Sequence, residues 1–311
     1  MKAGLLTAEQ KDLGGSEWCT VKIAESLVKR GHKVTVFVPH SDQVFGQDVT
    51  IQYNGVTYLS AQKAWRDVSH AIHWDVFIVS RDYSILSNTV LNTKLLVLWN
   101  HDILSDPDSF REHIHRADKI LCLSHYQKNQ YLNKLTDERT GKCTLEPGHI
   151  TITRNGIDLS LIKDTLEYSK PRARNGKEYK PTFIYTSRPE RGLFYLLRDI
   201  WPRVVQVIPE AKLKVAFYDV SQELLPDQIK EIHQAVYALL RTTPNVEFLG
   251  GLPRAELFKH VASAWSLIYP AIFCETFCLS IVESQALGTQ ALTSNRDALQ
   301  ETNYTDENII F

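Results

Sequence analysis

Two glutamates, Glu275 and Glu283, have seven residues between them in a stretch whose pattern predicts a strand, a loop and a helix. The backbone amides of Phe277, Cys278 and Leu279 would be the first-turn donors of that helix, which have no partner within the helix itself. Such donors, together with the helix dipole, favour an anion such as a phosphate. Two carboxylates beside a phosphate site suggest a ligand that is part phosphate and part polyol.

A second group of candidates is the pair Arg188 and Arg191, which follows a predicted strand at 182–187 and opens a predicted helix. Two guanidiniums at a helix start would bind a diphosphate through fork-like, charge-assisted hydrogen bonds. The alternative is an ordinary pair of surface arginines. If both predicted strands belong to one parallel sheet, these arginines and Glu275 would gather at the same edge of it.

The N-terminal half begins with a predicted strand at 2–7, a loop containing Gly14 and Gly15, a helix that stops at Gly31 and a strand at 33–38. This order is a βαβ unit. The two glycines could let the backbone approach a phosphate, or they could form only a turn. The loop is not G-x-G-x-x-G, which disfavours a nicotinamide-dependent enzyme.

Alternating strands and helices along the whole chain predict two open, doubly wound α/β sheets. The remaining predicted strands lie at 75–79, 94–99, 119–123, 149–153, 212–218, 245–249, 265–269 and 290–293. Ligands in such sheets bind at the carboxyl ends of the strands, which directs attention to Asn100-His101-Asp102 and to Arg154 through Asp158. The polar, basic stretch at 167–181 is bracketed by prolines and is typical of an interdomain linker.

Composition excludes several classes of protein. With 35 basic and 36 acidic residues, the net charge of −1 argues against nucleic-acid binding. The five cysteines form no C-x-x-C pair, so we expect reduced thiols and a cytoplasmic location. Cys274 and Cys278 have no further ligands nearby, so no zinc site is expected. No apolar run approaches the length of a membrane span.

Several motifs in order resemble those of the retaining glycosyltransferases of family 4, which have the two-domain GT-B fold. The matching segments cover nearly the whole chain and are 14–17, 31–36, 100–102, 155–158, 187–197, 209–213, 246–250, 275–283 and 298–301. The resemblance implies an N-terminal acceptor-side domain at 1–166, a linker at 167–181 and a C-terminal nucleotide-sugar domain at 182–311, with a cleft between the domains. It also implies that the closing C-terminal helices are missing from this chain.

The family transfers a sugar from a UDP- or GDP-sugar to a hydroxyl acceptor with retention, without a metal ion or other cofactor. Carried over by position, Glu275 would bind the donor sugar, and His101 would lie near the sugar or the reacting centre. Glu283 would bind the ribose of the donor. The diphosphate would be bound by Arg188, Arg191, Gly14, Gly15 and the amides of residues 277–279. The family attacks from the same face, with the departing phosphate helping to deprotonate the acceptor.

Some residues depart from the family pattern or admit simpler interpretations. Arg191 replaces a common lysine, Cys278 a common glycine and Gln290 a common proline. The shortened loop that carries Arg191 and the early end of the chain motivate a second hypothesis, a catalytically weak sugar-nucleotide-binding protein or partner subunit. His101 could be a satisfied loop histidine, Glu283 a helix-surface residue and Asp158 a helix cap. The amphipathic stretch 111–119 lacks a strong basic face and leaves only weak membrane contact open.

Overall fold

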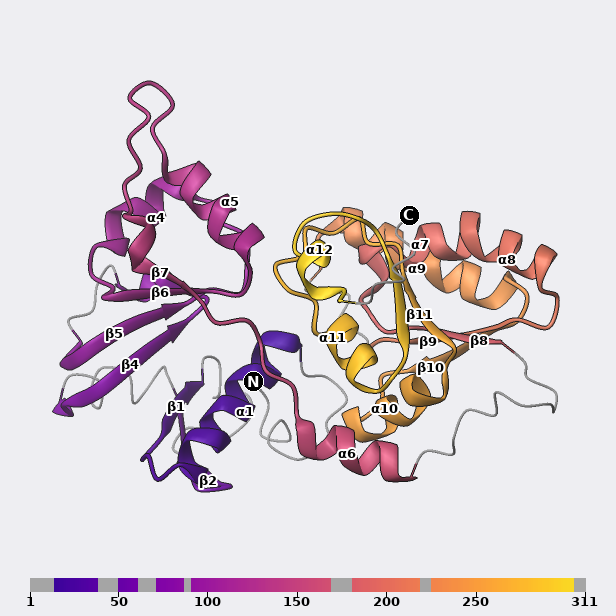
Figure 1. Cartoon of the computed structure of the whole chain (residues 1–311), viewed down its shortest axis with the longest axis horizontal. Coiled ribbons are helices and arrows are strands. Elements are labelled where there is room, and N and C mark those ends of the chain that lie inside the picture. Colours follow the sequence, from indigo (N-terminus) through magenta and orange to yellow (C-terminus); the bar gives the residue numbers. More distant parts are fainter. Residues whose placement is uncertain are drawn as a thin grey trace. The chain divides into compact units, whose positions relative to one another are not determined.

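The computed structural model describes residues 14–38, 50–60, 71–86, 91–168, 181–218 and 225–304. The described residues fall into two compact units, one ending at Gly156 and the other beginning at Ile157. Both are α/β units built on parallel strands (Figure 1). The predicted fold class is therefore confirmed. The predicted first strand at 2–7 and most of the predicted linker at 167–181 lie outside the described residues.

The N-terminal unit contains two sheets rather than the single sheet that the sequence predicts. Its elements are α1 (Gly15–Lys29), β1 (Thr35–Val38), β2 (Ile51–Tyr53), β3 (Val56–Ser60), β4 (Trp74–Ser80), η2 (Tyr83–Leu86), β5 (Thr93–Trp99), α4 (Pro107–Ile114), β6 (Lys119–Cys122), α5 (His125–Leu135), η3 (Pro147–His149) and β7 (Ile150–Ile152). The strand orders are β1-β3-β2 and β4-β5-β6-β7, and only the β2–β3 pair is antiparallel. Phe37 of β1 packs its ring against Trp74 and Phe77 of β4, which joins the cores of the two sheets.

The C-terminal unit is a five-stranded parallel sheet of order β10-β9-β8-β11-β12. Its elements are α6 (Leu159–Tyr168), β8 (Thr182–Tyr185), η4 (Pro189–Arg191), α7 (Leu193–Tyr195), the π-helical segment η5 (Leu196–Ile200), α8 (Trp201–Val207), β9 (Lys212–Ala216), α9 (Asp227–Thr242), β10 (Val246–Gly250), α10 (Arg254–Ser263), β11 (Ser266–Tyr269), α11 (Leu279–Ala286), β12 (Gln290–Thr293) and α12 (Leu299–Thr302). Pro202 stands in the first turn of α8, directly after η5, where a missing backbone N–H is tolerated.

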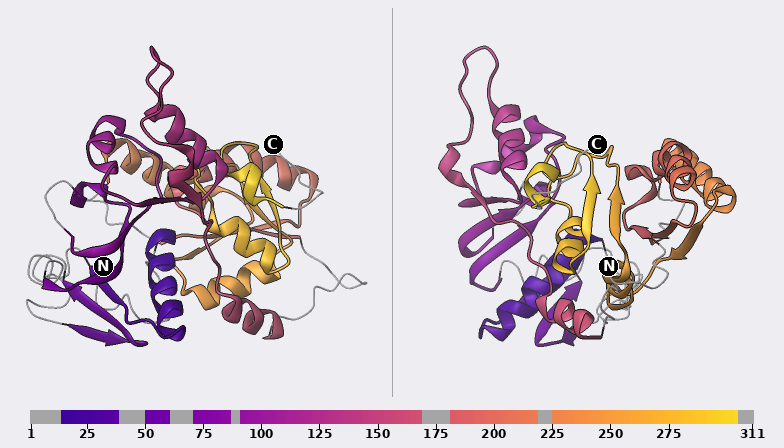
Figure 2. Two further views of the ribbon diagram at one scale, coloured as in Figure 1. Left: turned by 60° about the vertical axis from the view of Figure 1, so that its left-hand side comes forward. Right: turned by 45° about the vertical axis from the view of Figure 1, so that its right-hand side comes forward.

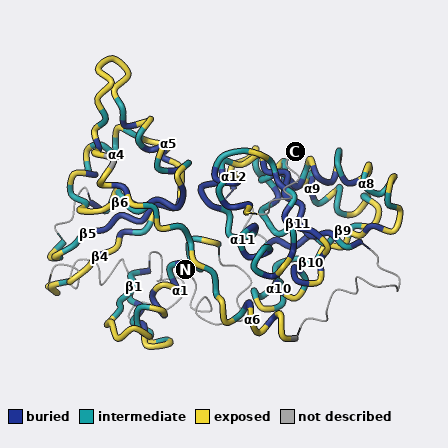
Figure 3. Tube along the Cα trace, in the orientation of Figure 1, coloured by how far each residue is buried: buried dark blue, intermediate teal, exposed yellow. Residues whose placement is uncertain are grey.

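Helices cover both faces of this sheet, with α8 and α9 on one face and α10 and α11 on the other (Figures 1 and 2). That division is the outcome expected when right-handed crossovers run outward from β8 in both directions. The inner strand β11 is buried from both sides, with all four of its residues buried, whereas the edge strand β10 has no fully buried residue (Figure 3). Unbroken apolar strands are typical of this environment.

Helix α6 packs with the C-terminal unit, so the compact units divide earlier than the expected domain boundary at residue 166. Ile162 of α6 is 4% exposed and belongs to the core of the C-terminal unit. Asp158 caps the helix, since its Oδ1 atom accepts a hydrogen bond from the Leu161 amide at 3.1 Å. The interpretation of Asp158 as a helix cap is therefore confirmed.

The stretch 111–119, in which the sequence left membrane contact open, is not one amphipathic helix. Helix α4 ends at Ile114, and Lys119 begins strand β6. The apolar side of α4 already faces the core, because Phe110 and Ile114 are 0% and 3% exposed. No helix in the described ranges has both the length and the apolar composition to cross a bilayer.

Candidate functional site

Strands β8 and β11 are neighbours in the middle of the C-terminal sheet, and their carboxyl ends carry the main candidate residues. The two strands pair in parallel through Ser266 with Phe183 and Leu267 with Ile184. Residues 188–192 follow β8, and residues 270–278 follow β11. The strand order changes direction at this point, which is where open α/β sheets bind ligands.

Arg191 and Glu275 form the centre of the site. The Nη1 atom of Arg191 lies 3.2 Å from Oε1 of Glu275, and the Tyr269 hydroxyl donates to the same oxygen at 2.5 Å. Glu275 is 5% exposed and Tyr269 1% exposed. A carboxylate in such a dry setting is held in one orientation by two donors, which prepares its outer oxygen to accept hydroxyl hydrogen bonds from a ligand.

The guanidinium of Arg191 is itself fixed on two sides. The Phe273 ring lies 4.0 Å from the guanidinium carbon, in cation–π contact. Burial disfavours the charge of Arg191, but Glu275, Tyr269 and other neighbours more than offset that cost, so the pKa of Arg191 is raised. Arg191 is therefore a permanent, oriented positive charge at the edge of the sheet.

Arg188 is near Arg191 in sequence but has a different carboxylate partner. Its Nε atom lies 2.7 Å from Oε1 of Glu190, and Oε2 of Glu190 lies 3.0 Å from Nε2 of His233 on α9. His233 is 1% exposed. Sequence reasoning missed both Glu190 and His233, since a single histidine within a polar helix has no distinguishing pattern. The result is a chain of contacts that runs from the buried His233 on α9 through Glu190 to the partly exposed Arg188.

Helix α11 begins at Leu279, as the sequence predicts, so the amides of Phe277, Cys278 and Leu279 belong to its start. No side chain caps this end of the helix. Cys278 has a φ of 71°, a left-handed conformation that favours glycine and accounts for the glycine expected at this position. Burial raises the pKa of the Cys278 thiol, which keeps it protonated and unreactive.

Glu283 lies inside α11 and is 6% exposed, so it is not a helix-surface residue. Arg254, the first residue of α10, contacts its Oε1 atom through Nε at 3.0 Å and also through Nη2. Burial raises the pKa of Glu283, while Arg254 acts to lower it and Asp158 to raise it. Arg254 was not a predicted site residue. In the sequence, Arg254 is only a basic residue at a helix start, and such residues are usually exposed to solvent.

Gly14, Gly15 and His101 belong to the N-terminal unit. Gly14 is the N-cap residue of α1, and Gly15 is the first helical residue, as the βαβ pattern predicts. Arg81, directly after β4, contacts both Glu17 in the first turn of α1 and Asp102, at 3.2 and 2.7 Å. The carboxyl edge of this sheet thus gathers charged groups around the head of α1.

His101 follows β5 and is 8% exposed, with its ring 4.3 Å from the ring of Trp99. The next residue, Asp102, is tethered through its backbone carbonyl, which accepts hydrogen bonds from Gln127 at 2.8 Å and Tyr131 at 3.3 Å on α5. Burial lowers the pKa of His101 to about 4, partly opposed by Asp102 and reinforced by Arg81. His101 is therefore a neutral imidazole near pH 7, suited to hydrogen bonding rather than to carrying charge.

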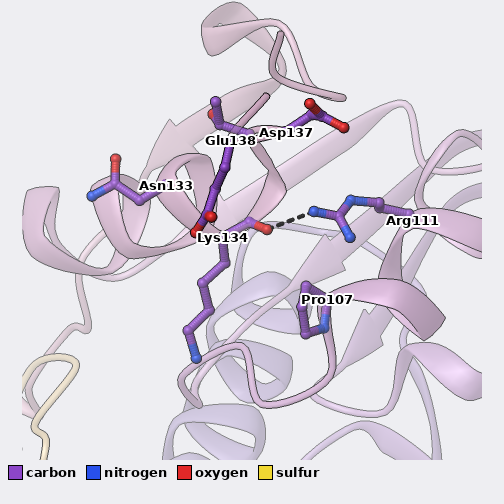
Figure 4. A pocket seen from close by; sticks show the side chains of 7 residues that line it. Pro107, Arg111, Asn133, Lys134, Asp137 and Glu138 are labelled. Carbon is purple, nitrogen blue, oxygen red and sulfur yellow. Dashed lines mark hydrogen bonds between the residues drawn. The ribbon is translucent and has the colours of Figure 1, made fainter. Parts of the chain in front are cut away.

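A pocket of about 560 Å³ lies elsewhere in the N-terminal unit, between the α4 start and the α5 end (Figure 4). Its lining residues are Pro107, Arg111, Asn133, Lys134, Thr136, Asp137 and Glu138. None of the predicted site residues lines it. Arg111 donates to the Lys134 carbonyl at 2.7 Å, so this pocket is bordered by a satisfied surface network.

No group of three or more histidine, cysteine, aspartate or glutamate side chains that could hold a metal ion occurs in the described part of the chain. All five cysteines are described, and none of them forms a disulfide.

Known glycosyltransferases resemble this chain in sequence and in fold. Residues 180–310 match the family model described as "Glycosyl transferases group 1". A phosphatidyl-myo-inositol mannosyltransferase from Mycobacterium leprae is 24% identical over 96% of this chain and 80% of its own length. The structure of Anabaena HepE in complex with UDP and glucose has a TM-score of 0.62 at 19% identity, covering 94% of this chain and 80% of that one. Sucrose-phosphate synthase from Thermosynechococcus elongatus has a TM-score of 0.66 at 15% identity, covering 93% and 77%.

The chain has the GT-B fold of glycosyltransferases, as the motif resemblance predicted. Its C-terminal unit, where Arg191 meets Glu275, coincides with the part matched by the glycosyltransferase family model. Fold and family match together support a glycosyltransferase.

Proposed function

We propose that this protein is a retaining, family 4 glycosyltransferase that moves a sugar from a UDP- or GDP-sugar to a hydroxyl acceptor. The observation that carries the proposal is the contact between Arg191 and Glu275 at the carboxyl edge of the sheet, beside the uncapped start of α11. One group suits a phosphate, the other suits sugar hydroxyls, and they touch. That HepE was solved with UDP and glucose, and another neighbour with ADP, adds support for a nucleotide-linked donor.

In this proposal each residue has a separate role toward the donor. Glu275 accepts hydrogen bonds from the hydroxyls of the sugar, and Glu283 accepts them from the ribose. Arg188, Arg191 and the amides of residues 277–279 bind the diphosphate, where positive charge and oriented N–H groups offset the negative charge that grows as the bond breaks. The roles of Gly14, Gly15 and His101 toward the donor stay predictions.

The reaction exchanges one bond at the anomeric carbon for another. The bond from this carbon to the diphosphate oxygen breaks, the acceptor oxygen bonds to the same carbon, and the acceptor proton passes to the departing phosphate. Retention through a covalent intermediate would instead need a carboxylate nucleophile. The carboxylate beside His101 is Asp102, which is engaged with Arg81, and we therefore propose same-face attack. The arginines supply the charge compensation, and we propose that no metal ion is required.

The test is to incubate the protein with a panel of UDP- and GDP-sugars and to measure release of free nucleotide. We expect turnover with at least one donor, and a loss of roughly a hundredfold or more in Glu275→Gln, because a hydrogen bond to a charged acceptor is lost at the reacting sugar. Glu231→Gln, at an exposed position on α9, is the matched control and should retain activity. Failure of every donor to bind, or full activity of Glu275→Gln, contradicts the proposal.

A second candidate, a sugar-nucleotide-binding protein with weak or no transfer, is favoured by one observation. The arginines at the site are already paired with carboxylates, Arg188 with Glu190 and Arg191 with Glu275. This candidate predicts a thermal shift with UDP or GDP but no nucleotide release from any donor. Ligand at a hundred times its Kd should add about 2.7 kcal/mol to the free energy of unfolding.

A further inference from the structure

Arg254 contacts one oxygen of Glu283 and leaves the other available. Its Nε and Nη2 atoms both lie against Oε1, with Nε at 3.0 Å. A fork-to-fork pair would instead occupy both carboxylate oxygens. Among the described residues Oε2 accepts no hydrogen bond, and it is not among the fully buried atoms without a partner. The pair therefore orients Glu283 without blocking it.

Arg254 is itself held in place from within α10. Its guanidinium carbon lies 5.8 Å from the ring centre of Phe258, one turn further along the helix. The side chain of Arg254 is 17% exposed and that of Glu283 is 7% exposed. The pair is thus partly shielded from water, where an ion pair orients its members more firmly than on an open surface.

The charged and titratable groups around Glu283 come from three directions. Arg254 faces it from α10, Asp158 from the start of α6, and Cys278 from the start of α11. Burial and Asp158 both favour the protonated carboxyl, and Arg254 is the group that opposes them. Without Arg254, the pKa of Glu283 would rise further. As the pH falls, the carboxylate would then become protonated at a higher pH than in the wild type.

We propose that Arg254 is a positioning residue for the nucleotide ribose, which holds Glu283 by one carboxylate oxygen and leaves the other turned to the ribose hydroxyls. This inference rests on the proposed function, since it takes Glu283 as the ribose contact. Arg254 acts through Glu283 and does not itself touch the reacting atoms. If Arg254 had only a structural role, replacing it would not change the preference for a nucleotide over its 2′,3′-dideoxy form.

The test compares UDP and GDP with their 2′,3′-dideoxy forms, by calorimetry at pH 7 and pH 9. The wild type should bind the better of the two nucleotides about tenfold or more tightly than its dideoxy form, since a hydrogen bond to a charged group contributes that much. In Arg254→Gln this preference should fall to about twofold or less at pH 7. It should be recovered at least in part at pH 9, because a higher pH favours the ionised carboxylate of Glu283.

Arg254→Lys is the conservative variant, and it should keep most of the preference at pH 7 because it restores the positive charge. Affinity for the dideoxy nucleotide should be the same in all three proteins. If Arg254→Gln weakens binding of the ribose and dideoxy nucleotides equally, or changes the binding of neither, the inference is wrong. If Arg254→Gln does not fold, a lysine variant with no preference overturns it as well. Absence of nucleotide binding in the wild type contradicts the proposed function instead.

Discussion

A β-carbon on Gly192 would lie 2.1 Å from the carbonyl oxygen of Pro270, far inside van der Waals contact. Gly192 also has a φ of 135°, which side-chain-bearing residues rarely adopt. This close approach lets the Arg191 carbonyl accept from the Ile272 amide at 3.2 Å, so it ties the loop after β8 to the loop after β11. We expect Gly192→Ala to lower the free energy of unfolding by about 2–4 kcal/mol, as measured by urea denaturation.

Gly288→Ala provides the matched control for this substitution. Gly288 has a φ of 72° but nothing within 4 Å of its would-be β-carbon. Gly288→Ala should therefore lower the free energy of unfolding by only about 1 kcal/mol, because only the backbone conformation is disfavoured. Equal losses in the two variants would show that the contact with Pro270 is unimportant.

Substitutions at Cys278 should separate backbone strain from packing. Cys278→Gly relieves the left-handed conformation at φ 71° and should stay within about 1 kcal/mol of the wild type. Cys278→Val should cost about 2 kcal/mol, because a β-branched residue is poorly accommodated there. Thermal or urea unfolding measures both. Cys274→Val, at a position without a positive φ, serves as the comparison and should cost less than Cys278→Val.

The stability of the protein should depend on pH through His101. Burial lowers the pKa of His101 from 6.5 to about 4. Between these values the unfolded chain binds more protons than the folded chain, so the free energy of unfolding should rise with pH across this window, by up to roughly 3 kcal/mol. Urea unfolding at pH 4.5, 5.5 and 7 should show this slope in the wild type and a smaller slope in His101→Asn. An unchanged slope in the variant would assign the effect to other groups.

The contact between His233 and Glu190 should affect diphosphate binding. A carboxylate oxygen only accepts, so Nε2 of His233 carries the proton that it donates to Glu190. His233→Leu should leave Glu190 short of a buried donor, lower the free energy of unfolding by about 1–3 kcal/mol, and loosen Arg188. Calorimetry should then show weaker UDP binding with little change for UMP. His233→Gln keeps a donor and should recover part of the loss, whereas equal weakening of both nucleotides would argue for a purely structural role.

Sequence reasoning located the centre of the site because the candidate residues follow neighbouring parallel strands. Apolar strand runs end at Tyr185 and Tyr269, and β8 pairs with β11, so the residues after each must converge. The sequence analysis missed the hairpin of β2 and β3, although its turn, Asn54-Gly55, with φ values of 48° and 78°, is a typical hairpin signal.

The partners of the predicted residues were harder to predict than the residues themselves. Arg254 and His233 stand on helices at positions with no motif, and only the packing of α10 and α9 brings them to Glu283 and Glu190. Long-range charge pairing depends on side-chain reach and helix rotation, which a linear pattern does not specify. The division of the N-terminal unit into two sheets was also missed, because a linear pattern does not specify which distant strands pair.

The strand order of the C-terminal sheet also has a consequence for how the protein folds. The chain adds β9 and β10 on one side of β8 before β11 arrives on the other side, so Arg191 and Glu275, 84 residues apart, meet only after a long loop closes. Contacts of this range are formed late and slow the folding of a domain. We therefore expect the β8–β9–β10 half to acquire structure first during refolding, and the capacity to hold a nucleotide to be among the last properties gained.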